Sequence, residues 1–299
     1  VGSEMCIRDR ILPKILAELY RCFKAGRLMK RNRLNDLDGS RWLYFTNTIW
    51  RTDYPPDPSH RLRKAHGAMK PPEAMRELVE FFTRAGEKVL DPFAGVGGTL
   101  LGAELAGREA LGVELNPRWV KVFNEIKKNY GMESGSIVKL NGRGVRRFRS
   151  RILEGDCLQV LRGMESGSFH ACICDPPYGP EQGRVSFRGE TNFDMDTCDP
   201  RDLGNASSVE DFLRLMARVG EQVRRLLAPA RYFVVLIGDR YMNGEFVPLG
   251  HLTAQKMRTV GFELKGIKIW WNAATQRRLK PYGLGNCFVP NITHQNVVI

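Results

Sequence analysis

After an irregular N-terminal part, segments with a helical spacing of apolar residues alternate along the chain with short apolar runs. Pro72 suits the first turn of a helix, and Met75, Leu78, Val79 and Phe82 follow it at separations of three and four residues. The same kind of spacing, or a turn signal followed by apolar residues, predicts further helices over residues 98–106, 116–126, 212–227 and 250–260. These segments provide the helical layers of the predicted fold.

The short apolar runs between these helices have the length and composition of buried strands. They cover residues 88–90, 110–114, 151–154, 169–174, 232–237, 262–270 and 294–299. Strands that alternate with helices form a parallel sheet covered on both faces. The pattern therefore predicts an α/β protein with a mostly parallel, seven-stranded sheet and helices on both faces.

The N-terminal part of the chain lacks this regular alternation. Residues 1–10 resemble a translated sequencing-adapter sequence and are excluded from the fold prediction. Residues 11–69 are basic and aromatic and are interrupted by prolines, so we expect an N-terminal extension with a short helix near 12–24. The main domain is expected over 70–299, with its last strand cut short at Ile299, and the chain is interpreted as a fragment at both ends.

The charge of the chain favours a polyanionic partner. The 299 residues carry a net charge of +13, and two basic runs, 21–34 and 139–151, contain no acidic residue. Solvated basic loops are the alternative interpretation. The residues expected to contact nucleic acid are Arg143, Arg146 and Arg147 in the second run and Arg277, Arg278 and Lys280 near the C-terminus.

Other classes of protein fit the composition poorly. No apolar run approaches the ~20 residues of a membrane span, and no secretory signal is visible. The seven cysteines form no Cys-x-x-Cys pair, and Cys172 and Cys174 have the spacing of small core residues on one strand. We therefore expect a reduced, cytoplasmic protein without a bound metal and without a membrane partner.

The most informative motif is Asp175-Pro176-Pro177-Tyr178, which follows the apolar run 169–174. A carboxylate can accept hydrogen bonds from an –NH2 group, and an aromatic ring offers a flat face for stacking. Together these groups suit a planar heterocycle that is held by an exocyclic amine. A simple turn after a strand is the alternative, because proline and aspartate favour turns.

A glycine-rich segment lies between the first predicted strand and the next helix. Residues 91–99 read Asp-Pro-Phe-Ala-Gly-Val-Gly-Gly-Thr, a Gly-x-Gly-Gly spacing that differs from the Gly-x-Gly-x-x-Gly of dinucleotide-binding enzymes. Glu114 ends the following strand, where an acid can accept from two ribose hydroxyls or cap the next helix. Asp156 follows the third strand and can accept from an adenine amine, cap a helix, or do both.

Four motifs in this order resemble the S-adenosylmethionine-dependent DNA amino-methyltransferases, which act on adenine N6 or cytosine N4. The motifs begin at Asp91, Gly112, Glu154 and Asp175, and the resemblance covers residues 70–240 well. It implies a Rossmann-like methyltransferase fold, S-adenosylmethionine as the cofactor and double-stranded DNA as the substrate. It also makes a restriction endonuclease an expected partner.

The resemblance also implies roles for individual residues. Lys70, Asp91, Phe93, Ala94, Gly95 and Gly97 would lie at the methionine end of the cofactor, Glu114 at its ribose and Asp156 at its adenine ring. Asp175 and the carbonyl of Pro176, with Pro177 beside them, would hold the target amine of a flipped base, and Tyr178 would stack on that base. The chemistry is a direct displacement on the sulfonium methyl that depends on positioning.

The target itself stays open at this point. Adenine N6 is favoured over cytosine N4, and no insert large enough for a separate recognition domain is present. An RNA methyltransferase acting on guanine N2 also fits the Asp-Pro-Pro-Tyr-Gly motif, and a non-catalytic nucleic-acid-binding module is a further alternative. Methylation of cytosine C5 is disfavoured because the chain contains no Pro-Cys pair for the cysteine nucleophile.

Overall fold

The computed structural model describes residues 32–141, 144–179, 199–242, 244–275, 279, 281 and 284–299. The chain divides into two compact units, residues 1–34 and 35–299, and the account that follows concerns the second unit. The helix expected near 12–24 lies outside the described residues.

A mixed sheet forms the centre of this unit. Its strands are β1 (Ile49–Thr52), β2 (Lys88–Asp91), β3 (Glu109–Glu114), β7 (Arg151–Glu154), β8 (Phe169–Cys174), β9 (Leu227–Ile237), β12 (Ile267–Asn272) and β13 (Gln295–Val298). They lie in the order β1-β12-β13-β9-β8-β2-β3-β7, and β13 runs antiparallel to both of its neighbours. The other neighbouring pairs are parallel. The predicted mostly parallel sheet is therefore confirmed.

The number of strands differs from the prediction. The described residues form an eight-stranded sheet, where seven strands were expected. The additional strand is β1, which lies in the segment interpreted as an extension and pairs with β12 from Ile49 with Ile269 to Thr52 with Asn272. Four residues whose burial alternates between exposed and buried are too short a run to stand out in the sequence.

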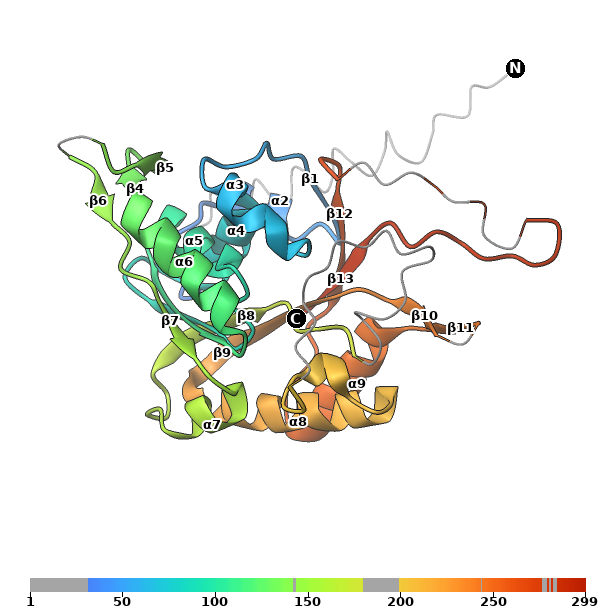
Figure 1. Ribbon diagram of the computed structural model, residues 1–299. Helices are drawn as coiled ribbons and strands as arrows, with labels where there is room; N and C mark the ends of the chain where they lie inside the picture. The colour runs from blue at the N-terminus through green and yellow to red at the C-terminus, as the bar shows by residue number, and fades with distance from the viewer. Residues whose placement is uncertain are drawn as a thin grey trace, which may run out of the picture. The chain divides into compact units, whose positions relative to one another are not determined.

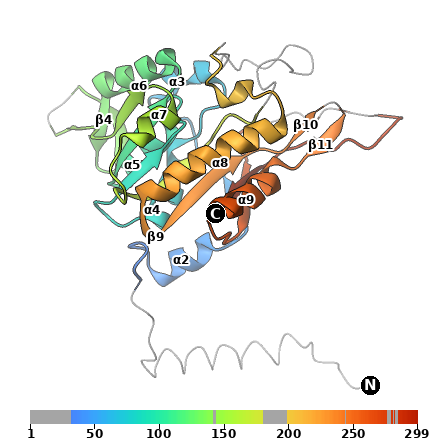
Figure 2. The same ribbon diagram turned by 90° about the horizontal axis from the view of Figure 1, so that it is seen from below.

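Helices cover both faces of the sheet, as predicted. They are α2 (Gly39–Phe45), α3 (His60–Arg63), α4 (Pro72–Phe82), α5 (Gly98–Leu105), α6 (Pro117–Asn129), α7 (Cys157–Arg162), α8 (Val209–Leu226) and α9 (Leu249–Val260), with 3-10 turns η1 (Lys64–His66) and η2 (Leu203–Asn205). Figures 1 and 2 show α4, α5 and α6 on one face and α7, α8 and α9 on the other.

The buried sides of these helices follow the apolar spacing of the sequence. Met75, Leu78, Val79 and Phe82 are all buried on α4. Helix α5 packs closely against α4 because Gly102 has no side chain: a Cβ there would lie 2.6 Å from Cβ of Met75. This close packing fixes the position of α4 and, with it, the Lys70 segment that leads into it.

Two small antiparallel sheets accompany the main sheet. One contains β4 (Tyr130–Glu133), β5 (Ser136–Lys139) and β6 (Arg146–Arg147), and the other contains β10 (Arg240–Met242) and β11 (Glu245–Val247). The two small sheets lie on opposite sides of the main sheet in both views (Figures 1 and 2). Strand β6 lies within the second basic run, residues 139–151, so part of that run belongs to a small sheet.

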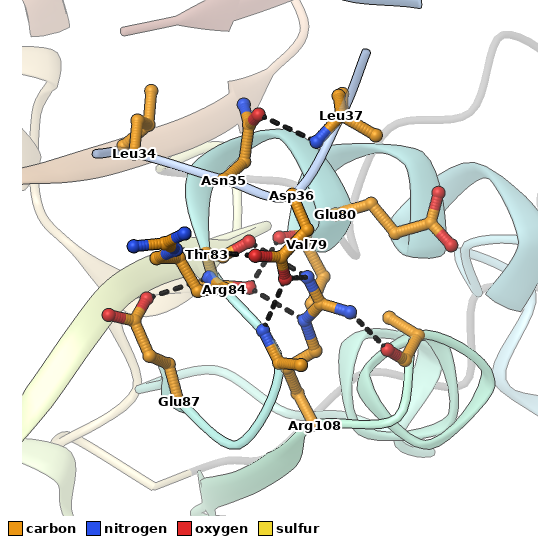
Figure 3. A network of polar contacts seen from close by, with 12 residues as sticks. Leu34, Asn35, Asp36, Leu37, Val79, Glu80, Thr83, Arg84, Glu87 and Arg108 are labelled. Atoms are coloured by element: carbon orange, nitrogen blue, oxygen red, sulfur yellow. Dashed lines mark hydrogen bonds and ion pairs between the residues drawn. The ribbon is translucent and has the colours of Figure 1, made fainter. Parts of the chain in front are cut away.

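A polar network ties the segment around Asp36 to the starts of β2 and β3 (Figure 3). The Asp36 carboxylate accepts from the backbone N–H of Ala85 at 2.6 Å and from the guanidinium groups of Arg84 and Arg108 at 3.2 and 3.3 Å. Arg108 also donates to the backbone carbonyl of Thr83 at 2.9 Å. These contacts lie at the edge of the sheet where the parallel strands begin.

The direction of the chain through the sheet changes between β2 and β8. From β2 the chain continues to β3 and then β7 on one side, and from β8 it continues to β9 on the other side. In open α/β sheets such a reversal leaves a crevice at the carboxyl ends of the two strands, and ligands bind there. Asp91 ends β2, and Asp175 follows β8 directly.

A candidate active-site pocket at the carboxyl edge of the sheet

A pocket of about 570 Å³ lies at the carboxyl edge of the sheet. One half is lined by the segments after β2, β3 and β7, and the other half by the segments after β9 and β12 and before β13. Residues 175–178 line the pocket and follow β8, which lies between the strands of the two halves. The Asp-Pro-Pro-Tyr motif therefore adjoins both halves.

The glycine-rich segment forms the floor of the first half. Gly95 and Gly97 adopt positive φ values of 50° and 82°, which glycine reaches without the steric cost that other residues incur. A Cβ on Gly95 would lie 3.0 Å from Nε2 of His66, and one on Gly97 would lie 2.2 Å from the ring of Phe123. Gly95 therefore keeps space open beside the pocket-lining His66, whereas the missing side chain of Gly97 leaves room for the buried ring of Phe123.

Glu114 ties the end of β3 to this glycine-rich segment. One carboxylate oxygen accepts from the N–H of Gly95 at 2.8 Å, and the other accepts from the N–H of Asn116 at 2.8 Å. Burial raises the pKa of Glu114 to about 7, and its backbone hydrogen bonds oppose this shift. Glu114 lines the pocket, and its contact with a ribose stays a prediction.

Asp91 lies below the same segment and is buried. Its carboxylate accepts from the N–H of Phe93 at 3.0 Å, which holds the turn after β2. Burial raises the pKa of Asp91 to about 7, and the charges of Asp175 and Glu114 add to the rise. Phe93 and Ala94 line the pocket beside Asp91, so these predicted cofactor residues are brought together, while their contacts with a cofactor remain predictions.

Asp156 caps helix α7. Its side chain accepts from the N–H of Leu158 at 2.9 Å, which is the capping geometry that was the alternative to a cofactor contact. The residue also lines the pocket, in the half next to Glu114. The cap and a contact with an adenine ring are compatible, because a carboxylate can accept several hydrogen bonds.

Polar contacts engage both oxygens of the Asp175 carboxylate. Lys70 forms an ion pair with Oδ2, and the hydroxyl of Tyr178 donates to Oδ1 at 2.8 Å. Lys70 is thus brought to the Asp-Pro-Pro-Tyr motif, although the sequence predicted a cofactor contact for it. Both Pro176 and Pro177 line the pocket beside these groups.

Tyr178 is held from two further directions. The side-chain amide of Gln295 donates to its hydroxyl oxygen, and the guanidinium of Arg240 donates to its backbone carbonyl at 3.0 Å. The ring packs against Gly238, where a Cβ would lie only 2.9 Å from the ring. The motif is therefore a rigid element, and the stacking of Tyr178 on a base stays a prediction.

Several pocket residues were not predicted from the sequence, among them His66, Gln295 with Gly238, and the adjacent tryptophans Trp270 and Trp271. Burial, together with the charges of Lys70 and Arg63, lowers the pKa of His66 to about 4. Its ring contacts Trp119 at a centroid distance of 4.9 Å. No spacing in the sequence marks these residues, although the Trp-Trp pair at the end of a predicted strand was a usable signal.

Of the predicted nucleic-acid residues, the structure describes Arg146 and Arg147, and neither lines the pocket. Arg146 forms an ion pair at 2.9 Å with Glu104 at the end of α5, and its neighbour Arg149 pairs with Glu109 at the start of β3. Arg146 and Arg147 thus lie toward the edge where the strands begin, opposite the pocket. Arg143, Arg277, Arg278 and Lys280 lie outside the described residues.

Comparison with known proteins bears on this geometry. Residues 24–125 match a family model described as DNA methylase, of the N6 and N4 methyltransferase type. The resemblance to the amino-methylating DNA methyltransferases is confirmed. The matched residues include Lys70, the glycine-rich segment and Glu114. S-adenosylmethionine, the cofactor predicted from the sequence, is bound in a solved putative DNA modification methylase of Thermus thermophilus that is 24% identical over 48% of this chain and 52% of that chain, with a TM-score of 0.34.

Curated relatives of two kinds are similar to the chain. A Type II methyltransferase, M.BglI of Bacillus subtilis, is 30% identical over 36% of this chain and 29% of its own length. A tRNA (guanine(10)-N2)-dimethyltransferase of Pyrococcus abyssi is also 30% identical, over 36% of this chain and 28% of its own length. The chain thus spans less than a third of the length of these relatives.

Solved structures with some similarity include a TehB-like SAM-dependent methyltransferase from Corynebacterium glutamicum. It is 16% identical, the match covers 75% of this chain and 85% of that chain, and the TM-score is 0.40. A SAM-dependent methyltransferase from Aquifex aeolicus is 11% identical over 88% of this chain and 97% of that chain, with a TM-score of 0.41.

In the described part of the chain, no helix has the length and apolar character needed to cross a membrane.

Proposed function

We propose that this chain is an S-adenosylmethionine-dependent methyltransferase that modifies the exocyclic amine of a base in double-stranded DNA, with adenine N6 favoured over cytosine N4. The observation that carries the proposal is the position of Asp175. Its carboxylate lies in one pocket with the glycine-rich segment and Glu114, between the strands of the two halves. A methyl-transfer enzyme needs a group that accepts hydrogen bonds from the target amine, and this group must lie where the cofactor and the target meet.

The first half of the pocket fits the cofactor. The free space beside Gly95 would be filled by a Cβ, and three carboxylates, Asp91, Glu114 and Asp156, line this half. S-adenosylmethionine carries a sulfonium and an ammonium group, so a pocket lined by acids suits its charge. When bound, the cofactor supplies an electrophilic methyl group.

The second half fits the target base. Asp175 and the carbonyl of Pro176 would accept the two hydrogens of the target amine, which leaves the nitrogen lone pair directed at the methyl group. The new N–C bond would form as the S–C bond of the sulfonium breaks, which leaves one excess proton on the nitrogen, and the Asp175 carboxylate would accept this proton. The base leaves the duplex first, because its amine is otherwise paired.

A second candidate function is methylation of guanine N2 in RNA. The observation that favours it is the similarity to the curated tRNA (guanine(10)-N2)-dimethyltransferase. The DNA assignment is preferred because the matched family model is a DNA methylase. A non-catalytic binding module would need neither the Lys70–Asp175 ion pair nor the glycine-rich segment, so both features support an enzyme.

The deciding experiment incubates the protein with labelled S-adenosylmethionine and either unmethylated duplex DNA or unmodified tRNA, followed by mass analysis of the nucleosides. We expect N6-methyladenine from the DNA. N4-methylcytosine would change the target base within the proposal, and N2-methylguanine from tRNA alone would replace the proposal by the second candidate. A restriction endonuclease as partner remains a prediction from the family resemblance.

A further inference from the structure

The outer face of the β1–β12 edge carries a cation–aromatic pair. Arg51 on β1 lies opposite Trp271 on β12 in the strand register, and the guanidinium carbon lies 5.3 Å from the centre of the indole ring. Both side chains are exposed, and Trp271 retains 45% of its accessible surface. The two strands lie side by side at one edge of the main sheet (Figure 1).

Trp270, the neighbour of Trp271 on β12, is part of the core at this edge of the sheet. Trp270 is buried, donates to the hydroxyl of Thr52 at 2.9 Å and stacks on Trp50 at a centroid distance of 5.3 Å. Successive residues of a strand point to opposite faces, so Trp271 points away from this core. Packing within the described residues therefore accounts for Trp270 and leaves the exposure of Trp271 unexplained.

Trp271 also belongs to the pocket. It lines the same cavity as Asp175, in the half formed by the segments after β12 and before β13. This is the half that lies away from the glycine-rich segment and Glu114 in the strand order, on the target side. An exposed indole at this location meets whatever carries the target base into the pocket.

We propose that Trp271, backed by Arg51, is a stacking platform for a nucleobase of the DNA strand that carries the target base. This inference rests on the proposed function and adds the residues that hold the strand. An indole stacks on any base, and a guanidinium on its other face strengthens the ring contact and can reach a phosphate. The ion pair of Arg51 with Asp53 is long, 4.0 Å, and exposed, so Arg51 is available to an anion.

The charge of the protein supports nucleic acid as the occupant of this surface. The net charge of +13 attracts a polyanion, and the exposed ring with its cation matches a base with its phosphate. Neighbouring Ile49 and Ile269, which face each other in register, extend the apolar surface beside the pair. The ring stacks on the face of a base while the guanidinium contacts its phosphate, so both groups of the pair are used by a DNA strand.

The test measures binding of a fluorescein-labelled, unmethylated duplex DNA of mixed sequence by fluorescence anisotropy, with S-adenosylmethionine affinity measured separately by calorimetry. We expect Trp271→Ala to raise the Kd for DNA about tenfold and Trp271→Phe to retain most of the affinity. Arg51→Ala should weaken binding several-fold and reduce the slope of log K against log salt by about one. Cofactor affinity should stay unchanged in all three variants.

Two control variants match these changes in chemistry. Tyr44 is an aromatic residue with 77% exposure on α2 that does not line the pocket, and Arg149 lies toward the opposite edge of the sheet. Tyr44→Ala and Arg149→Ala should leave the DNA affinity within twofold of that of the original chain. If Trp271→Ala behaves like Tyr44→Ala, the platform is wrong.

A direct optical readout keeps the inference testable even if the alanine variant folds poorly. DNA should quench tryptophan emission in the original chain, and Trp271→Phe should abolish most of this quenching. Quenching by unmodified tRNA but not by DNA would overturn DNA as the occupant. If the original chain methylates neither DNA nor tRNA while the Trp271-dependent quenching by DNA persists, the proposed function fails and the platform stands.

Discussion

Lys70 and Asp175 form an ion pair although 105 positions of sequence separate them. Both side chains are largely shielded from solvent, at 10% and 20% exposure. The backbone of Lys70 is fixed in turn, because its carbonyl accepts from the guanidinium of Arg63 at 3.1 Å, and the buried Arg63 is paired with Asp57. The segment before α4 therefore positions a cation on the carboxylate that is proposed to hold the target amine.

Replacement of Lys70 should impair catalysis more than cofactor binding. Without the ammonium group, the charge of the largely shielded Asp175 carboxylate is less compensated, and the side chain is less firmly oriented. We expect Lys70→Met to lower kcat about 100-fold and Lys70→Arg to restore part of it, measured by methyl incorporation into DNA. Lys88→Met, at the exposed start of β2, is the matched control and should have full activity. Equal losses of kcat and cofactor affinity would instead indicate a cofactor contact.

Asp175→Ala should abolish methyl transfer and leave the affinity for S-adenosylmethionine within about threefold. The carboxylate is the proposed acceptor for the amine, and it lies outside the glycine-rich half of the pocket. Single-turnover methylation and calorimetric titration of the cofactor separate the two effects. Asp175→Asn retains the size of the side chain and should be nearly as inactive. Turnover at the original rate in either variant would contradict the assigned role.

Gly95→Val should block the cofactor half of the pocket. The φ of Gly95 is +50°, and a Cβ would lie 3.0 Å from Nε2 of His66, so the side chain would fill the space beside the ring. We expect cofactor affinity to fall at least 30-fold in calorimetric titration. Gly86→Val provides the control, because Gly86 has a φ of +80° with no atom within 4 Å of its Cβ position. Both variants carry the backbone strain of about 1 kcal/mol or more, and only Gly95→Val should lose affinity.

The sequence predicts the fold well where local pattern determines it. Helix α4 and strand β8 were predicted because their burial follows from periodicity and from a continuous apolar run. Strand β1 was missed because four residues are too short a run to stand out, and the strand pairs with β12, which lies more than two hundred positions away.

In the candidate site, too, local motifs could be predicted from the sequence, whereas contacts between distant segments could not. The order of the motifs brings Asp91, Glu114, Asp156 and Asp175 to one edge of a mostly parallel sheet, where all four line the pocket. The partners of these residues could not be predicted in the same way. The contact between Gln295 and Tyr178 joins β13 to the segment after β8, and it depends on the antiparallel insertion of β13 beside β9.

Asp91 predicts a specific pH dependence of stability. Its pKa is about 7 in the folded protein, against an ordinary value of 3.8 for an aspartate in water, so the folded state keeps a proton that the unfolded state releases. The stabilisation from Asp91 is therefore complete below about pH 4 and is lost as the pH rises toward 7, by up to about 1.4 kcal/mol per pH unit. Above pH 7 both states are ionised and the loss stops.

The measurement compares urea unfolding of the original chain and of Asp91→Asn at a series of pH values between 4 and 9, without cofactor. Asparagine can still accept from the N–H of Phe93 but carries no titrating proton. We expect the difference in unfolding free energy to shift in favour of Asp91→Asn between pH 4 and 7 and to stay constant above it. Phe93→Ala, which leaves the carboxylate in place, should keep the pH dependence of the original chain. A difference between the original chain and Asp91→Asn that does not change with pH would show that Asp91 is ionised in the folded protein throughout this range.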